Sequence, residues 1–453
     1  MKKIYLFFFT TLTLSLSAQE WNFQYVDFGA KPDIAVDKEG SVHIAYMLEE
    51  TPGFIKHAQV QDTGFQITVI DQAYYYGPLA IALDAEGNPA IAVHHHDDED
   101  EYVYRWDGVF WEALPIPSEG HDGWDNSLAF DSQNNIHTSS IDPAQFGSGD
   151  GVEYAYYDGN VWTKESIQAG PAKYEFSTCI QVDQNDVPHL VFYDDIGDNL
   201  VYANRVSGEW TNETVANKGG MFASLVLDAN NLPHISYYEQ VEGEAGNVHY
   251  TYFDGEAWQS MVVDQLNYVP ISFTGARNLT ALAKDDNGTL HLAYSDRKVL
   301  KYATLAQETW QIESLLDYTE SDTLLGAQTG LGVDAAGNPH ITYFELLDQS
   351  PVSGNIMYAS KPVLSNTNLV VALPFTVKLL PNPASEKLRI VFDVMPKQAV
   401  SLQLFSSEGR LLKNETVQAQ AAVDWDLEDL PKGFYSLQIR CGTQKWSEQL
   451  VKQ

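Results

Sequence analysis

The sequence is poor in cysteine, in basic residues and in long apolar stretches. Its 453 residues include two cysteines, Cys179 and Cys441, so no disulfide framework can be read from it. Lys and Arg number 26 against 62 Asp and Glu, which gives a formal net charge of −36. A chain this acidic repels nucleic acid, anionic lipid and polyanionic glycans, so we expect neutral or cationic partners and no nucleic acid. Beyond the N-terminal region no stretch has the ~18 apolar residues of a membrane-spanning helix, and we expect no transmembrane span.

The N-terminal residues have the three parts of a secretory signal peptide. A pair of lysines precedes an apolar run over residues 4–16, and two small residues, Ser17 and Ala18, follow it. A buried N-terminal strand is the alternative. We predict that residues 1–18 are a signal peptide that directs the chain to the periplasm and that the mature protein begins after residue 18.

One pattern recurs along most of the chain, as in residues 34–46. A short apolar strand ends in Asp, and after a tight turn a second strand opens with His six residues later. The anchor aspartates are Asp37, Asp84, Asp131, Asp183, Asp228, Asp285 and Asp334. The residues six positions later are His43, Ala90, His137, His189, His234, His291 and His340. A third strand, often with Tyr-Ala, and a fourth that begins with an aromatic residue complete each copy. Four short alternating strands per copy are typical of a β-propeller blade, so we predict an all-β fold with a seven-bladed β-propeller over residues 19–364.

The ends of the repeat array suggest how the ring closes. The seventh copy stops at Ser360, after its third strand, and lacks the fourth. A strand of the missing type, led by Trp21, lies at the mature N-terminus over residues 20–26. We predict that it completes the last blade, because this removes the free sheet edges.

Features shared by nearly all copies are expected to be scaffold, because a functional site requires one particular arrangement of residues, whereas a repeated feature occurs around the whole ring. This applies to the repeated His, which can bond groups of its own turn. It applies also to the acids that stand five residues after that position, where the second strand ends. They are Asp142, Asp194, Glu239, Asp296 and Glu345. A ring of carboxylates would suit calcium, the one cofactor that this pattern suggests, but acceptance of N–H bonds from the neighbouring loops is the favoured interpretation.

Residues that depart from the repeat are the candidates for a functional site. In known propellers the site usually lies on the face that carries the ends of the second strands. In the second copy that strand ends in His94, His95 and His96, followed by the acids of residues 97–101. Such a density of ligands would suit a divalent metal, although only His94 and His96 share a side of a strand. A solvated acidic loop is the alternative.

Aromatic and basic residues on the same face complete the candidate ligand-binding set. The aromatic candidates are Tyr74, Tyr75, Tyr76, Trp124 and Tyr174. Exposed rings would suit sugars or peptide side chains, whereas packing between blades is expected for roughly half of them. Arg277 precedes the first strand of the sixth copy and Arg297 follows its second strand, and the two would clamp a carboxylate or pair with ring acids such as Asp296.

Residues 365–453 have a different pattern. The motifs are Leu380-Pro-Asn-Pro-Ala384, the alternating strand of residues 387–391, and Leu430-Pro-Lys-Gly-Phe-Tyr435. This module resembles the type A C-terminal sorting domain of the type IX secretion system of Bacteroidetes-like bacteria. The resemblance implies a small antiparallel β-sandwich that directs the protein through the type IX machinery, and a protein that is released or held on the outer cell surface. An adhesive immunoglobulin-like domain is the alternative.

The leading hypothesis is a secreted or surface-displayed recognition propeller that binds a glycan or an extracellular protein. It rests on the aromatic loops and on the lack of a complete catalytic set, which favours binding over catalysis but leaves an enzyme open. A glycan-active hydrolase or lyase that uses His, Tyr and acid groups of single blades is the first alternative. A sialidase-like enzyme is disfavoured, because the propeller has four arginines and none of the Ser-x-Asp-x-Gly-x-Thr-Trp turns of that family. A purely architectural surface protein is the second alternative.

Overall fold

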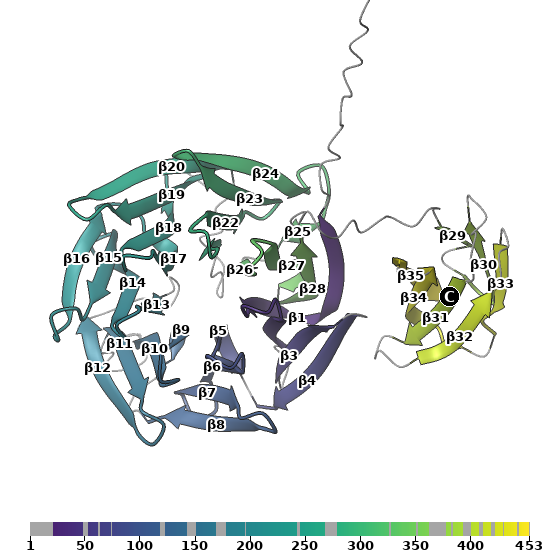
Figure 1. The fold of residues 1–453 in the computed structure, drawn as a ribbon, viewed down its shortest axis with the longest axis horizontal. Coiled ribbons are helices and arrows are strands. Elements are labelled where there is room, and N and C mark those ends of the chain that lie inside the picture. The colour runs from purple at the N-terminus through teal and green to yellow at the C-terminus, as the bar shows by residue number, and fades with distance from the viewer. Residues whose placement is uncertain are drawn as a thin grey trace, which may run out of the picture. The chain divides into compact units, whose positions relative to one another are not determined.

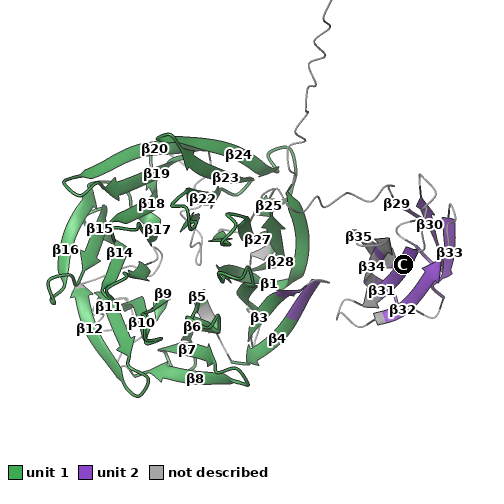
Figure 2. Cartoon of the chain, in the orientation of Figure 1, with its two compact units in different colours: residues 1–59, 67–363 green, residues 60–66, 364–453 purple. Residues whose placement is uncertain are grey.

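The computed structural model shows an all-β protein with two compact units. It describes residues 21–48, 53–61, 64–73, 75–117, 123–142, 151–168, 178–194, 196–241, 245–267, 279–325, 328–349, 352–361, 377–381, 384–392, 400–406, 411–417, 422–428, 430–441 and 444–452. The first unit comprises residues 1–59 and 67–363, and the second comprises residues 60–66 and 364–453 (Figure 2). Residues 1–18 and 362–376 lie outside the described ranges, so the signal peptide and the domain limits 19–364 and 365–453 stay predictions.

The strands of the first unit follow one another as short antiparallel neighbours. In chain order they are β1 (Asn22–Val36), β2 (Val42–Leu48), β3 (Phe54–Gln61), β4 (Gly64–Asp71), β5 (Tyr75–Leu83), β6 (Pro89–His95), β7 (Asp100–Trp106), β8 (Trp111–Ile116), β9 (Trp124–Phe130), β10 (Ile136–Asp142), β11 (Gly151–Tyr157), β12 (Trp162–Gln168), β13 (Thr178–Val182), β14 (Pro188–Asp194), β15 (Asn199–Asn204), β16 (Thr211–Ala216), β17 (Met221–Leu227), β18 (Pro233–Gln240), β19 (Gly246–Phe253), β20 (Trp258–Leu266), β21 (Thr280–Lys284), β22 (Leu290–Ser295), β23 (Val299–Ala306), β24 (Thr309–Asp317), β25 (Leu324–Leu325), β26 (Gly330–Val333), β27 (Pro339–Gln349) and β28 (Val352–Ser360).

These strands form the blades of a propeller (Figure 1). The sheets β5–β8, β9–β12, β13–β16, β17–β20 and β21–β24 each have four strands. A larger sheet joins β1–β4 to β26–β28. Within the described residues, the innermost strands contact one another in a closed circle, β1, β5, β9, β13, β17, β21, β26 and back to β1. This circle has seven members, one for each copy of the repeat, and the blades are numbered here in the same order.

The N-terminal strand takes part in two blades. The first half of β1 pairs with β28, as in Phe23 opposite Ala359, and forms the outer strand of blade seven. Its second half pairs with β2, as in Ala35 opposite His43, and forms the inner strand of blade one. Irregularities in the pairing after Tyr25 and after Ala30 allow the strand to pass from one sheet to the next. The N-terminus of the ring is thereby hydrogen-bonded to its C-terminal end.

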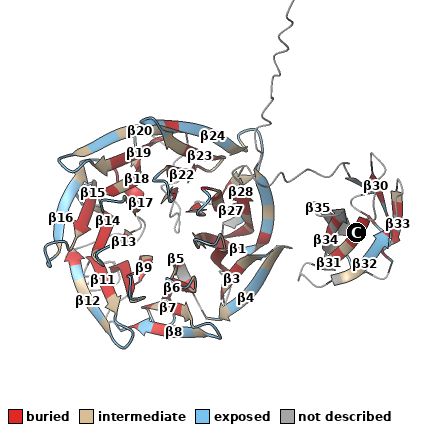
Figure 3. Ribbon diagram, in the orientation of Figure 1, coloured by how far each residue is buried: buried red, intermediate tan, exposed pale blue. Residues whose placement is uncertain are grey.

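The core of the propeller lies between neighbouring blades. Inner and second strands are largely buried, whereas outer strands are largely exposed or partly exposed, as Figure 3 shows for β16 and β20. A ring of the third strand in one blade meets the leading Trp of the next blade edge to face. These pairs are Tyr154–Trp210, Tyr202–Trp258, Tyr250–Trp310 and Tyr302–Trp21. Each such pair stabilises a junction by about 0.5–1.5 kcal/mol beyond the burial of its area. Because Trp21 makes the fourth contact, the N-terminal strand replaces the missing outer strand of blade seven in packing as well.

The second unit is a small antiparallel β-sandwich. Its strands are β29 (Val377–Leu380), β30 (Lys387–Phe392), β31 (Val400–Ser406), β32 (Leu411–Val417), β33 (Ala422–Asp426), β34 (Gly433–Cys441) and β35 (Gln444–Lys452). One sheet has the order β29-β30-β33 and the other β32-β31-β34-β35. Leu388 and Trp425 of the first sheet share one buried core with Leu402 and Leu437 of the second. Among the described residues of the whole chain, no helix has the length and apolarity needed to cross a membrane.

Candidate functional site

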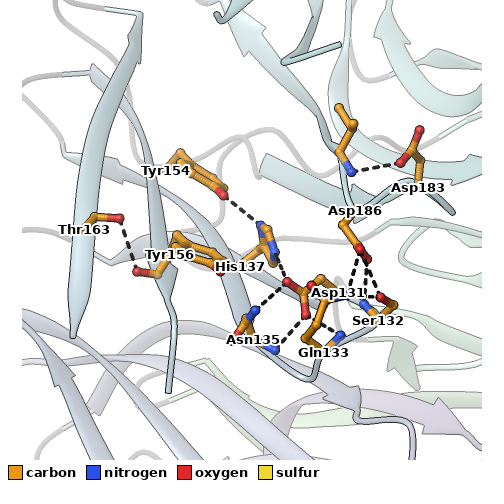
Figure 4. Close-up of polar contacts among 11 residues, drawn as sticks. Asp131, Ser132, Gln133, Asn135, His137, Tyr154, Tyr156, Thr163, Asp183 and Asp186 are labelled. Atoms are coloured by element: carbon orange, nitrogen blue, oxygen red, sulfur yellow. Dashed lines mark hydrogen bonds and ion pairs between the residues drawn. The ribbon is translucent and has the colours of Figure 1, made fainter. Parts of the chain in front are cut away.

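The repeated His is part of the scaffold. In blade three, the carboxylate of Asp131 accepts hydrogen bonds from the backbone N–H of Gln133 and Asn135 and so holds the turn (Figure 4). His137 lies between this carboxylate, 3.6 Å from Nε2, and the Tyr154 hydroxyl, 2.8 Å from Nδ1. The carboxylate favours a proton on Nε2, so the Tyr154 hydroxyl donates to Nδ1. Burial lowers the pKa of His137, although Asp131 opposes the shift, and the ring is neutral at pH 7.

The same pairing of His with a Tyr of the third strand occurs in four more blades. The pairs are His189–Tyr202, His234–Tyr250, His291–Tyr302 and His340–Tyr358. In blade one His57 takes the place of the Tyr, with Nε2 2.9 Å from Nδ1 of His43. Blade two has lost both partners, because Ala90 stands at the His position and the buried Val103 at the Tyr position. Among the described blades, blade two is therefore the one without a polar pair at these two positions of its second and third strands.

The end of that strand gathers a cluster of polar groups. His94 and His96 lie on one side, as strand alternation predicts, and Glu99 reaches the same side through the turn that follows. Nε2 of His94 is 3.7 Å from one Glu99 oxygen, and Nδ1 of His96 is 3.5 Å from the other. Glu99 has a positive φ of 59°, the left-handed conformation that brings its side chain back over the strand end. We name these three residues the blade-two cluster; sequence reasoning included the two His among its candidates and noted Glu99 only as one of the acids of residues 97–101.

His95 lies on the opposite side of the strand and has a separate set of partners. Its ring meets Tyr75 edge to face at 5.3 Å and stacks on Tyr102 at 4.6 Å. Nδ1 of His95 is 3.2 Å from Asp98, whose carboxylate also accepts a hydrogen bond from Tyr102. That hydrogen bond, with partial burial, raises the pKa of Tyr102 to about 12. The three adjacent His therefore divide between two environments.

The aromatic candidates that the structure describes are not exposed plates. Tyr75 is 2% exposed, and its hydroxyl donates to Asp71 across 2.9 Å. Trp124, the first residue of β9, is 4% exposed and packs its ring 4.6 Å from that of His94. Both follow the alternative of packing between blades, which covers their rings. Trp124 instead forms one wall of the blade-two cluster.

Several other candidates lie partly or wholly outside the described residues. Tyr74, Tyr174 and Arg277 are among the residues that the structure does not describe. The backbone of Tyr76 pairs with His94, but its side chain is not described. Arg297 is partly buried, and its carbonyl accepts the N–H of Leu325 across 2.8 Å. The convergence of Arg277 and Arg297 on one ligand thus stays a prediction.

The acids at the other strand ends have bonds within the protein. Asp296 accepts the N–H groups of Lys298 and Val299 at 2.7 and 2.8 Å, and Asp194 accepts that of Ile196 at 3.2 Å. Glu239 accepts bonds from Asn247 and His249, Glu345 accepts one from Tyr318, and Asp142 is buried. Within the described part of the chain, the blade-two cluster is the one group of three His, Cys or acid side chains close enough to share a metal ion. Calcium on the acid ring stays a prediction.

The comparisons with known proteins bear mainly on the second unit. Residues 378–453 match the model of the secretion system C-terminal sorting domain. The C-terminal unit is a sorting domain. The protein is therefore exported through the type IX secretion system to the cell surface or the extracellular space, as the resemblance of these residues implies. No curated protein sequence matches the chain significantly.

Several solved structures have similar folds at low identity. A protein of unknown function from Dyadobacter fermentans is 11% identical, with 75% of this chain and 97% of that chain covered and a TM-score of 0.42. Polysaccharide lyase Uly1 is 10% identical, with 73% and 90% covered and a TM-score of 0.44. The GH93 α-L-arabinofuranosidase of Fusarium graminearum, solved with arabinobiose, is 12% identical, with 63% and 92% covered and a TM-score of 0.43.

Proposed function

We propose that the exported propeller is a recognition module that binds a glycan or an extracellular protein at the end of the second strand of blade two. The observation that carries this proposal is the blade-two cluster, His94, His96 and Glu99. Elsewhere in the described ring no other group of three His, Cys or acid side chains lies this close together. Polar groups that depart from the repeat and gather at one strand end are best explained by a ligand.

The charge of the chain narrows the class of ligand. A formal net charge of −36 disfavours polyanionic glycans and favours neutral or cationic ligands. Imidazole and carboxylate groups together accept and donate hydrogen bonds, which suits sugar hydroxyls or the polar side chains of a peptide. A neutral glycan is the form of the proposal that is tested first.

The test is a glycan array probed with the mature protein, followed by mass spectrometry of any oligosaccharide that binds. Binding to neutral glycans that leaves them intact is the expected result. Cleaved products would overturn the proposal in favour of an enzyme. Silence on the array, together with failure to capture an extracellular protein, would overturn it in favour of an architectural role.

A further inference from the structure

The blade-two cluster has the composition of a metal centre as well as of a binding surface. Two imidazole nitrogens and one carboxylate oxygen, from His94, His96 and Glu99, lie within 4.8 Å of one another. We propose that these three side chains bind one divalent transition-metal ion, with Zn²⁺ as the probe. The proposal goes beyond ligand recognition, because it assigns a metal to the site where recognition is proposed.

The distances between the ligand atoms suit a first-row ion. Tetrahedral Zn²⁺ with ligands at about 2.0–2.1 Å holds those ligands about 3.3 Å apart. Glu99 oxygens lie 3.7 Å from Nε2 of His94 and 3.5 Å from Nδ1 of His96. The two imidazole nitrogens lie within 4.8 Å of each other, and rotations of the His96 and Glu99 side chains, both partly exposed, would bring the three ligand atoms to this spacing. Calcium prefers six to eight oxygen ligands, so two imidazoles favour a transition metal instead.

The backbone presents the three side chains together before any metal binds. His94 is the last residue but one of β6, His96 is the first residue of the turn after the strand, and their ring nitrogens lie within 4.8 Å of each other. Glu99 returns toward these two rings through its left-handed backbone, with a φ of 59°. Non-glycine residues adopt this conformation where the surrounding structure holds it, and such residues gather at ligand sites.

The neighbouring blade holds the buried ligand in place. His94 is fully buried, and the ring of Trp124 from blade three packs against it at an angle of 33°. The His94 ring therefore has little freedom to turn away from Glu99. His96 and Glu99 remain accessible, which provides a path for the ion to enter.

Three protein ligands leave at least one coordination position open. Structural zinc sites have four protein ligands, whereas sites that act on a ligand keep a position for water or for that ligand. An ion in the blade-two cluster would thus offer an open position to a hydroxyl or carbonyl oxygen of a bound molecule. The role of this open position in ligand binding rests on the proposed function, whereas metal binding itself is measured without any glycan or protein ligand.

The experiment uses the mature full-length protein, purified through a tag that contains no histidine, treated with EDTA and desalted. It is titrated with ZnCl₂ by isothermal calorimetry, and retained zinc is counted by inductively coupled plasma mass spectrometry. The expected result is about one zinc ion per chain and a thermal midpoint that rises with zinc and falls again with EDTA. Absence of zinc binding in the wild type would overturn the proposal.

Two variants and a control locate the ion. His96→Gln and Glu99→Gln change partly exposed side chains and are each expected to weaken zinc binding by about tenfold or more. His249→Gln is the matched control, because His249 forms a pair with Glu239 at 2.7 Å that lacks a third ligand among the described residues. Zinc binding that survives both cluster substitutions, or that falls equally in the control, would overturn the assignment. Zinc binding without any glycan or protein ligand would leave the metal site standing while the proposed function fails.

Discussion

The hydroxyl of Tyr154 donates a hydrogen bond to Nδ1 of His137 across 2.8 Å, and this contact recurs with other residues in four further blades. It joins the third strand of a blade to the beginning of the second strand, where the His lies. Asp131 lies on the other side of the His137 ring and holds the turn before the second strand by accepting a backbone N–H bond from that turn. The three residues therefore form one structural unit. A His that might be taken for a catalytic group is thereby assigned to stability.

Tyr154→Phe is expected to lower the free energy of unfolding by about 1–2 kcal/mol, because it leaves the buried Nδ1 of His137 without its donor. Urea unfolding measures the change. Tyr157→Phe on the same strand is the control, since its hydroxyl has no hydrogen bond among the described residues. Equal effects of the two substitutions would mean that the His–Tyr bond contributes nothing.

Blade one predicts a pH dependence that can be traced to one residue. Burial, with a contribution from the neighbouring His43, lowers the pKa of His57 to about 3. The unfolded chain binds this proton below pH ~6.5 and the folded protein does not, so stability is complete above that pH and is lost as the pH falls toward 3. The loss approaches about 1.4 kcal/mol per pH unit for a single such His.

His57→Tyr places in blade one the residue type that pairs with the repeated His in five other blades, and it removes the buried imidazole of His57. We expect the thermal midpoint of this variant to fall less than that of the wild type between pH 7 and pH 5. Differential scanning calorimetry at both values makes the comparison. Parallel pH profiles would show that His57 is not responsible.

Gly123 precedes Trp124 and lies against Glu101 of blade two. Its φ is +79°, and an added Cβ would meet the Cβ of Glu101 at 2.6 Å. Gly108 has a similar φ of +98° but nothing within 4 Å. Gly123→Ala is therefore expected to cost about 1–3 kcal/mol more than Gly108→Ala in chemical unfolding, since only the first adds a clash to the backbone strain. Similar costs would place the whole effect in the backbone conformation.

Ring closure predicts the effect of removing the N-terminal strand. Deletion of residues 19–28 would leave β28 as an open edge and Tyr302 without the ring of Trp21. The expected outcome is a lower thermal midpoint and association of chains in size-exclusion chromatography. A truncated protein that stays monomeric with an unchanged midpoint would show that blade seven does not need the strand.

The scaffold was largely predictable from the sequence because its signals are local and repeated. An Asp anchor, a turn and a His six residues later define the same contacts in most blades, so one copy informs the others. Ala90 marked blade two as a departure, whereas the Tyr partner of the repeated His and its replacement by Val103 were not predicted. Period-2 alternation correctly separated His94 and His96 from His95.

The composition of the candidate site was less predictable, because it depends on one turn and on packing between blades. Glu99 joins the two His through a left-handed backbone conformation, which a glutamate in the sequence does not predict. The sequence did not show which aromatic candidates would pack between blades, and Trp124 and Tyr75 are both covered by side chains from elsewhere in the sequence. Contacts between blades are set by the assembled ring, and no local pattern encodes them.

The most direct test of the account compares three proteins on one neutral-glycan array: the wild type, His96→Gln in the blade-two cluster, and His249→Gln on the third strand of blade five, where His249 pairs with Glu239. The account predicts that wild type and His249→Gln bind the same glycans and that His96→Gln loses the signal while keeping its thermal midpoint. Equal binding by all three would contradict the placement of the site in blade two. Silence of the wild type would contradict glycan recognition itself.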